Sequence, residues 1–163
     1  MQGSLPFEMI KLRYLLIAVI VLLDQIVKFA VRALMYIGES VPVLENVFHI
    51  TYVQNRGAAF SMFSGARFIL IILPAAAIFA AIWYMEKNKK EHWSLSLSLC
   101  LIIAGGLGNL IDRLFLGFVT DMFDFRIWPV FNIADIAVCV GAGFLILYTL
   151  AFYGKNDKKT EDM

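Results

Sequence analysis

Two aspartates, Asp121 and Asp135, stand in short polar motifs that interrupt an otherwise apolar sequence. If their carboxyl groups lie close together, both cannot readily be ionised, and they share a proton. One carboxylate can then take a proton from water while the other carboxylic acid protonates the departing amide or polarises its carbonyl. The pair therefore predicts the acid–base chemistry of an aspartic protease.

Asp135 also has a purely structural interpretation. Asn132 precedes an apolar run and could cap a helix that begins there, with Asp135 at the third helical position. The N-terminus of a helix favours an anion. We therefore expect Asp135 to be the more readily ionised partner and Asp121 to hold the shared proton more often.

The remaining residues argue against other peptidase chemistries. The only histidines are His49 and His92, so no His-Glu-x-x-His zinc motif exists, and no serine stands in a Gly-x-Ser-x-Gly context. The glycine-rich stretch Gly105–Asn109 lacks the acid of the Gly-x-Gly-Asp peptidases and matches no nucleotide-binding pattern. Cys100 and Cys139 lie inside apolar runs, so we expect neither thiol catalysis, nor a disulfide framework, nor a metal site.

The composition indicates where this chemistry would take place. Of the 163 residues, 61% are apolar, against ~45–50% in a soluble domain. Only 17% are charged, and the mean hydropathy is +0.77. A single domain of this size cannot bury so much apolar surface, which argues against a soluble enzyme. The net charge of +1 gives no excess of positive charge to attract a nucleic acid, which argues against a nucleic-acid-binding protein. The chain is predicted to be a membrane protein.

Four long apolar stretches could cross the bilayer. The second and third have no charged residue over 18 and 19 positions, enough to span ~30 Å of hydrocarbon at ~1.5 Å per residue. The first resembles the start of a signal peptide but lacks a small-residue cleavage site, so we interpret it as an uncleaved helix. The predicted helices cover Tyr14–Leu34, Phe68–Met85, Trp93–Ile111 and Ile133–Tyr153.

The connection between the first two helices has the residues of β-strands. Val41–Val43 and Val47–Val53 are rich in β-branched and aromatic residues, and Glu45-Asn46 between them is a turn signal. We expect a small antiparallel sheet here. The predicted fold class is therefore an all-α integral membrane protein of four transmembrane helices, with a small β-rich outer segment between helices 1 and 2.

Loop charges predict the orientation in the membrane. Eight basic residues lie on one side of this topology: Lys11, Arg13, Lys87, Lys89, Lys90, Lys155, Lys158 and Lys159. The opposite connections carry Arg56, Arg67, Arg113 and Arg126. The positive-inside rule therefore places both termini in the cytoplasm and the two longer connections outside.

The chain is divided into three parts. We interpret residues 1–10 as an N-terminal extension of the kind left by an expression vector. Residues 11–155 form one membrane domain, and residues 156–163 form a charged cytoplasmic tail.

Charged residues also lie inside the predicted helices. Asp24, Lys28 and Arg32 share one helix stripe, and Asn109, Asp112 and Arg113 share one side of the third helix near its outer end. Each charge near the bilayer centre would cost about 2.5–3.5 kcal/mol, so the first stripe must face protein or water. The simplest interpretation is an Asp24–Lys28 pair that fixes helix packing, and Asp24→Asn should then lower stability by leaving Lys28 unpaired.

Five motifs occur in the order seen in bacterial lipoprotein signal peptidase, the signal peptidase II family, which the chain resembles over nearly its whole length. They are Asp24-Gln25 with Lys28, Asn55-Arg56-Gly57-Ala58-Ala59-Phe60-Ser61, Gly105–Arg113, Val119-Thr120-Asp121 and Phe131-Asn132-Ile133-Ala134-Asp135. The resemblance implies a multi-pass enzyme of the bacterial inner membrane with its active site toward the outer face and no metal or organic cofactor. Its substrates would be prolipoproteins that carry diacylglycerol on the cysteine following the cleavage site.

The resemblance also assigns residues. The family's catalytic acids map onto Asp121 and Asp135. Its other functional positions, which bind substrate or support the site, map onto Asp24, Lys28, Asn55, Gly57, Asn109, Arg113 and Asn132. Asp112 matches the motif too and is interpreted as a scaffold acid. Arg56 departs from the family, which more often has a small residue there. The expected partners are the prolipoprotein and membrane lipid, with no nucleic acid, and the expected state is a monomer.

A carrier for ions or protons is the alternative, because intramembrane Asp, Lys and Arg also mark ion pathways. Such a protein should have ionisable residues near the middle of several helices, whereas the second and third helices lack them. A membrane scaffold without catalysis would need neither Asp121 nor Asp135. The acids also gather at one face of the membrane, so we favour a peptidase.

Overall fold

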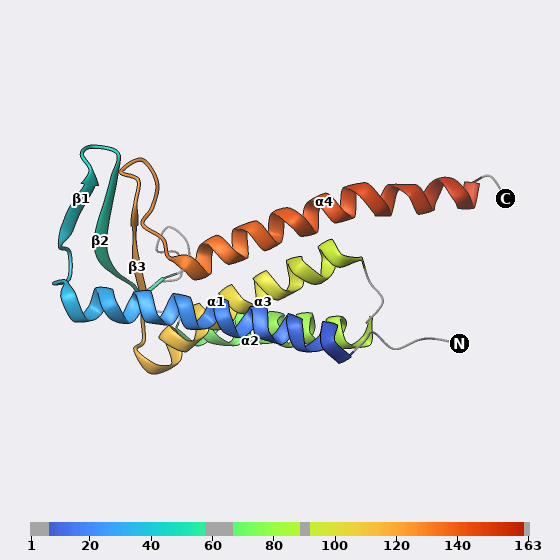
Figure 1. The fold of residues 1–163 in the computed structure, drawn as a ribbon, viewed down its shortest axis with the longest axis horizontal. Helices are drawn as coiled ribbons and strands as arrows, with labels where there is room; N and C mark the ends of the chain where they lie inside the picture. The colour runs from blue at the N-terminus through green and yellow to red at the C-terminus, as the bar shows by residue number, and fades with distance from the viewer. Residues whose placement is uncertain (1–6, 58–66, 89–91, 162–163) are drawn as a thin grey trace.

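The computed structural model describes residues 7–57, 67–88 and 92–161. Four helices in this part of the chain are long and apolar enough to cross a membrane. They are α1 (Phe7–Leu34), α2 (Arg67–Lys87), α3 (Trp93–Phe115) and α4 (Ile133–Glu161). The start of α1 and the end of α4 lie at the same end of the bundle, opposite a small sheet (Figure 1). The four predicted helices are confirmed.

All four helices extend beyond their predicted apolar stretches, and α1 and α4 do so most. Helix α1 begins at Phe7, inside the segment interpreted as an extension, and α4 continues to Glu161, beyond Tyr153. Backbone hydrogen bonds can continue a helix past the end of its apolar run, so hydropathy alone does not set where the helix begins or ends.

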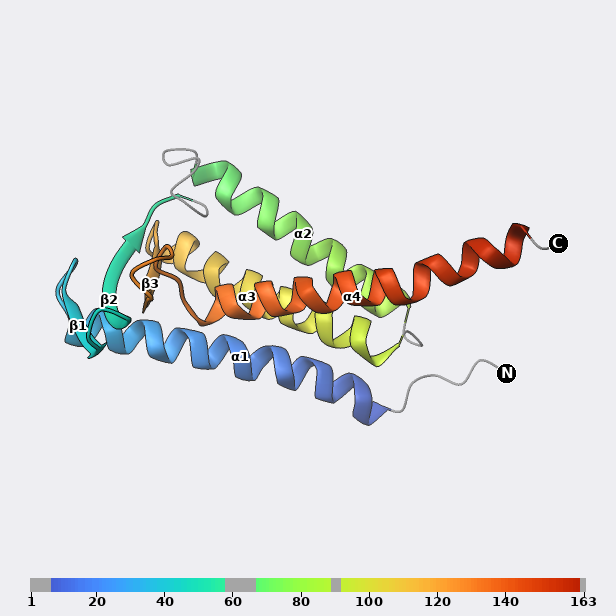
Figure 2. The ribbon, with the colours of Figure 1, turned by 90° about the horizontal axis from the view of Figure 1, so that it is seen from above.

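Helix α3 lies at the centre of the bundle, between α1, α2 and α4 (Figure 2). Its buried side chains Leu99, Cys100 and Ile103 form one core with Ile17 of α1 and Ile78 of α2. Small residues allow this close packing. A Cβ atom on Gly108 would lie 2.6 Å from Asp24 Oδ2 and 3.1 Å from the Ala134 side chain, so only glycine fits between α1 and α4 at this point.

The sheet has three strands in the order β1-β2-β3, all antiparallel. Strands β1 (Ser40–Leu44) and β2 (Phe48–Asn55) confirm the small antiparallel sheet that was predicted here. Strand β3 (Val119–Asp124) was not predicted, so the description as an all-α protein with β-structure only between helices 1 and 2 is incomplete. Gly117, with φ 80°, lets the chain turn from α3 into this strand.

A second small core joins the sheet to the C-terminal end of α1. Val31 of α1, Tyr52 of β2 and Met122 of β3 are buried together. Because β3 is held at once by the sheet and by α1, its residues have a defined position relative to the helices.

Candidate active site

Asp121 is presented by β3, where it pairs with Val53 of β2. Its side chain is 2% exposed. Asn132 Nδ2 donates a hydrogen bond to Asp121 Oδ1 at 2.7 Å, and Asn55 Nδ2 donates one to Oδ2 at 3.0 Å. Both oxygens are therefore held by amide side chains from two other segments.

Asp135 lies in the first turn of α4, as predicted. Asn132 Oδ1 accepts from the Asp135 backbone N–H at 2.9 Å, and Asp135 Oδ2 accepts from the Asn132 backbone N–H at 3.1 Å. This reciprocal pair confirms the predicted capping box. The other oxygen, Oδ1, accepts from Asn109 Nδ2 at 2.8 Å. The capping role thus occupies one carboxylate oxygen and leaves the other directed toward α3.

The two acids have different environments. Burial is the largest cause that raises the pKa of Asp121 from 3.8 to about 7, and repulsion from Asp135 acts in the same direction. Hydrogen bonds from Asn55 and Asn132 oppose this shift. A carboxyl group with such a pKa can hold a proton near neutral pH and donate it. This agrees with the expectation that Asp121 holds the shared proton more often than Asp135.

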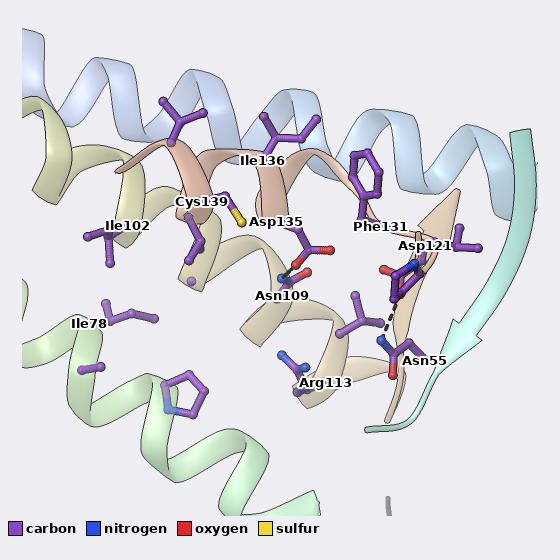
Figure 3. Close-up of a pocket in the computed structure, with 18 of the residues that line it drawn as sticks. Asn55, Ile78, Ile102, Asn109, Arg113, Asp121, Phe131, Asp135, Ile136 and Cys139 are labelled. Atoms are coloured by element: carbon purple, nitrogen blue, oxygen red, sulfur yellow. Dashed lines mark hydrogen bonds between the residues drawn. The ribbon is translucent and has the colours of Figure 1, made fainter. Parts of the chain in front are cut away.

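Both acids line one cavity, of about 690 Å³, between α2, α3, α4 and the sheet (Figure 3). Five of the nine predicted site residues line it: Asn55, Asn109, Arg113, Asp121 and Asp135. Its other walls are mainly apolar and include Ile78 of α2, Ile102 of α3 and Ile136 of α4. The cavity therefore combines a polar end with an apolar body.

The other predicted site residues lie around this cavity. Asn132 is fully buried behind the two acids and hydrogen-bonded to Asp121. Arg113 Nη2 donates to the Gly57 carbonyl at 3.2 Å, which links the end of β2 to α3. Arg56, the departure from the family pattern, is exposed. Ala58, Ala59, Phe60 and Ser61 of the same motif lie outside the described residues.

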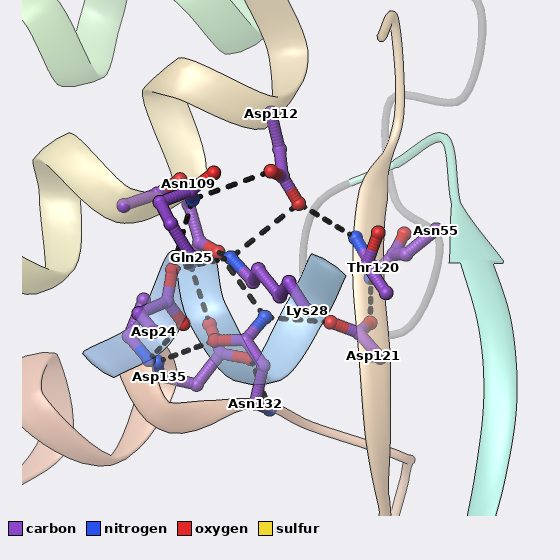
Figure 4. Close-up of polar contacts among 12 residues, drawn as sticks. Asp24, Gln25, Lys28, Asn55, Asn109, Asp112, Thr120, Asp121, Asn132 and Asp135 are labelled. Atoms are coloured by element: carbon purple, nitrogen blue, oxygen red, sulfur yellow. Dashed lines mark hydrogen bonds and ion pairs between the residues drawn. The ribbon is translucent and has the colours of Figure 1, made fainter. Parts of the chain in front are cut away.

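Asp24 and Lys28 form the predicted ion pair, at 2.9 Å, and both are buried (Figure 4). Asp112 is a second partner, with Oδ2 at 3.5 Å from Lys28 Nζ. The expectation that Asp24→Asn leaves Lys28 unpaired is therefore wrong, because a carboxylate from α3 remains beside it. Asp24 also accepts the Ala134 backbone N–H at 2.9 Å and so satisfies one donor at the start of α4.

Asp112 acts as the scaffold acid expected from the sequence, and it has two neighbours, Arg32 and Gln25, to which no supporting contact was assigned. Asp112 Oδ2 accepts the Thr120 backbone N–H at 2.9 Å, and Arg32 Nη1 donates to Thr120 Oγ1 at 2.9 Å. Both contacts hold β3 at Thr120, the residue before Asp121. Gln25 Nε2 donates to the Gly108 carbonyl at 3.1 Å. Gln25 and Thr120 lie in two of the five motifs, but their contacts with α3 and α1 could not be predicted from the motifs.

The loop before α4 also contributes to the cavity, through Trp128, Pro129 and Phe131. Phe131 is held by an isolated bridge to Phe123 and by stacking on Phe125, with ring centroids 5.9 Å apart. Within the described part of the chain, no group of three or more His, Cys, Asp or Glu side chains could hold a metal ion.

Comparisons with known proteins agree on one family. The family model described as signal peptidase (SPase) II matches residues 16–151. A lipoprotein signal peptidase of Halothermothrix orenii is 48% identical over 135 residues, covering 83% of this chain and 92% of the relative. One from Clostridioides difficile is 46% identical over 146 residues, covering 88% and 98%.

Two solved structures share the fold. Both are described as bacterial membrane enzymes determined by the in meso method. The first has a TM-score of 0.84 at 30% identity and covers 93% of each chain. The second has a TM-score of 0.80 at 29% identity and covers 92% of this chain and 97% of the other.

Proposed function

Since this chain belongs to the signal peptidase II family and is a peptidase that removes signal peptides from lipoproteins, we propose that Asp121 and Asp135 are its two catalytic acids. One observation carries this proposal. Two carboxyl groups from different segments line the same cavity, and Asn132 hydrogen-bonds to both residues. This is the arrangement that two-carboxylate hydrolysis needs.

In the proposed reaction a water molecule lies between the acids. Asp135, as the anion, takes a proton from the water, whose oxygen forms a bond to the scissile carbonyl carbon, while Asp121 gives its proton to the carbonyl oxygen. The tetrahedral intermediate then collapses. Its C–N bond breaks, the proton on Asp135 moves to the departing nitrogen, and Asp121 recovers a proton from a hydroxyl of the intermediate. The products are a carboxyl group on the signal peptide and a free amino group on the lipoprotein.

The amide side chains around the acids have supporting roles in this proposal. Asn55 and Asn132 hold Asp121, and Asn109 holds Asp135. Arg113 lines the same cavity and is bonded to the Gly57 carbonyl, so these two residues would position the substrate peptide. Asp24 and Lys28 support the site from behind, and no metal or organic cofactor takes part.

The substrate is proposed to be a prolipoprotein that carries diacylglycerol on the cysteine after the scissile bond. The apolar body of the cavity supports this, because acyl chains and an apolar signal helix that arrive laterally from the lipid could lie along its walls. We propose that the protein acts as a monomer. Membrane lipid is the remaining partner.

A cleavage assay tests the proposed function. The purified protein in lipid vesicles should cut a synthetic diacylated prolipoprotein at one bond, before the lipidated cysteine, and mass spectrometry identifies both products. The alternative of an ion or proton carrier predicts ion-dependent pH changes inside the vesicles and no cleavage. Only cleavage that is lost in the Asp121→Asn protein supports the assignment of the acids.

We further propose that the protein lies in the bacterial inner membrane with both termini in the cytoplasm and the sheet outside. The predicted result is that cysteines introduced at Glu45 and Asn88 react with an impermeant reagent from opposite sides, Glu45 from outside. Both natural cysteines are first replaced by alanine, and cleavage activity confirms that this background folds. Labelling of Asn88 from outside intact cells would contradict the orientation.

The pKa of Asp121 predicts the pH dependence. Because Asp121 must be protonated to donate its proton, kcat should fall by about tenfold per pH unit above pH ~7. A control separates this loss from unfolding. The pKa of Asp121 in the folded protein lies above 3.8, which is its ordinary value in an unfolded chain. Its contribution to the free energy of unfolding therefore declines as pH rises from 3.8 to about 7 and is constant above pH 7. A kcat that stays level or rises from pH 7 to 9 would refute this role.

A further inference from the structure

Lys28 lies next to the site without forming part of its cavity. Its side chain is 0% exposed, and it is not among the residues that line the cavity. Two carboxylates, Asp24 at 2.9 Å and Asp112 at 3.5 Å, balance its charge. These two ion pairs would be sufficient if Lys28 served only to hold the helices together. Lys28 has a third contact, however, with a residue that lines the cavity.

That third contact is with a neutral amide. Lys28 Nζ donates to Asn109 Oδ1 at 2.9 Å, and Asn132 Nδ2 donates to the same oxygen at 3.1 Å. At the other end of the amide, Asn109 Nδ2 donates to Asp135 Oδ1 at 2.8 Å. The amide of Asn109 thus lies between an ammonium group and a proposed catalytic carboxylate (Figure 4).

Only one orientation of this amide is compatible with both neighbours. An ammonium group can donate hydrogen bonds but cannot accept them, and an ionised carboxylate can only accept. If the amide were rotated by half a turn, its NH2 group would face Lys28 and its oxygen would face Asp135. Both contacts would then be repulsive.

We propose that Lys28 is a positioning residue, which sets the orientation of the Asn109 amide and thereby supplies Asp135 with its side-chain N–H donor. The inference rests on the proposed role of Asp135. With Lys28 removed, the donor to Asn109 Oδ1 that remains among the described residues is Asn132 Nδ2, which is shared with Asp121. Asp135 would then lose its donor in a large fraction of molecules, and its carboxylate would no longer be held in the orientation that takes the proton of water.

The test compares two double variants that keep the buried charge balanced. Asp24→Asn with Lys28→Gln replaces the ion pair by two amides, and the glutamine NH2 group can still donate to Asn109. Asp24→Asn with Lys28→Met has a side chain of similar length but no donor. Both variants leave Asp112 paired with Arg32, whose Nη1 lies 3.7 Å from Asp112 Oδ1. The measurements are kcat and KM on the diacylated substrate, with thermal stability of each protein.

We expect the methionine variant to have a kcat about tenfold or more below that of the glutamine variant, with KM unchanged within about twofold. Equal kcat values in two equally stable variants would overturn the proposal, and so would a difference confined to KM. Asp121→Asn serves as the reference. If the Asp121→Asn protein cleaves substrate as fast as the unchanged protein, the proposed function itself fails. Equal activity of the two double variants, in contrast, contradicts only the role of Lys28.

Discussion

Replacing either acid by its amide is expected to abolish cleavage. Asp→Asn preserves the shape of the side chain and part of its hydrogen bonding but cannot ionise or donate a carboxyl proton. Asp121→Asn should remove the proton donor, and Asp135→Asn the group that takes a proton from water. Each change should lower kcat by at least about a thousandfold. The measurement is the cleavage rate per folded molecule.

Asp124→Asn is the matched control, because Asp124 lies on the same strand as Asp121 but does not line the cavity. Its carboxylate accepts from Thr51 Oγ1 at 2.8 Å and from Arg126 Nη1 at 3.0 Å, on the outer part of the sheet. Its kcat should stay within about threefold of the unchanged protein, since no contact of Asp124 reaches the reacting groups. Substantial turnover by stable Asp121→Asn or Asp135→Asn protein would exclude the pair as catalytic acids.

Removing the lipid from the substrate is expected to have the second large effect. The acyl chains reach the cavity from lipid that is equally apolar, so their contribution is to anchor the modified cysteine and place the scissile bond beside the acids. A reacting bond misplaced by about 1 Å can lower the rate about a hundredfold. The apolar walls of the cavity, from α2, α3 and α4, are where the chains would be held. An unmodified prolipoprotein should therefore be cleaved with a kcat/KM at least about a hundredfold lower.

The comparison needs two substrates of one sequence, one with the diacylglyceryl group and one with a small alkyl group on the same cysteine. Both are presented in the same vesicles, and the membrane-bound amount of each is measured, so that a difference in partitioning is not mistaken for recognition. Equal kcat/KM values per bound substrate would remove lipid recognition from the mechanism.

Several features follow from the sequence by itself, because they depend on residues close together in the chain. The apolar runs predict four membrane-spanning helices, since the cost of exposing backbone polar groups to lipid leaves few alternatives. The spacing of Asn132 and Asp135 predicts the capping box, and that of Asp24 and Lys28 predicts an ion pair on one helix stripe. Strands β1 and β2 follow from their β-branched residues and the turn between them.

Other features were decided only by the tertiary structure. Strand β3 is short and buried on both faces, so it has no polar–apolar alternation, and its partner β2 is distant in the sequence. No local pattern could reveal the dual role of Asp112, which contacts Lys28 of α1 and Thr120 of β3. The orientation of the Asn109 amide likewise depends on Lys28 and Asp135, from two other helices. The acids themselves were recognisable from their motifs, but their common cavity results from packing among α2, α3, α4 and the sheet, which requires the whole chain to fold.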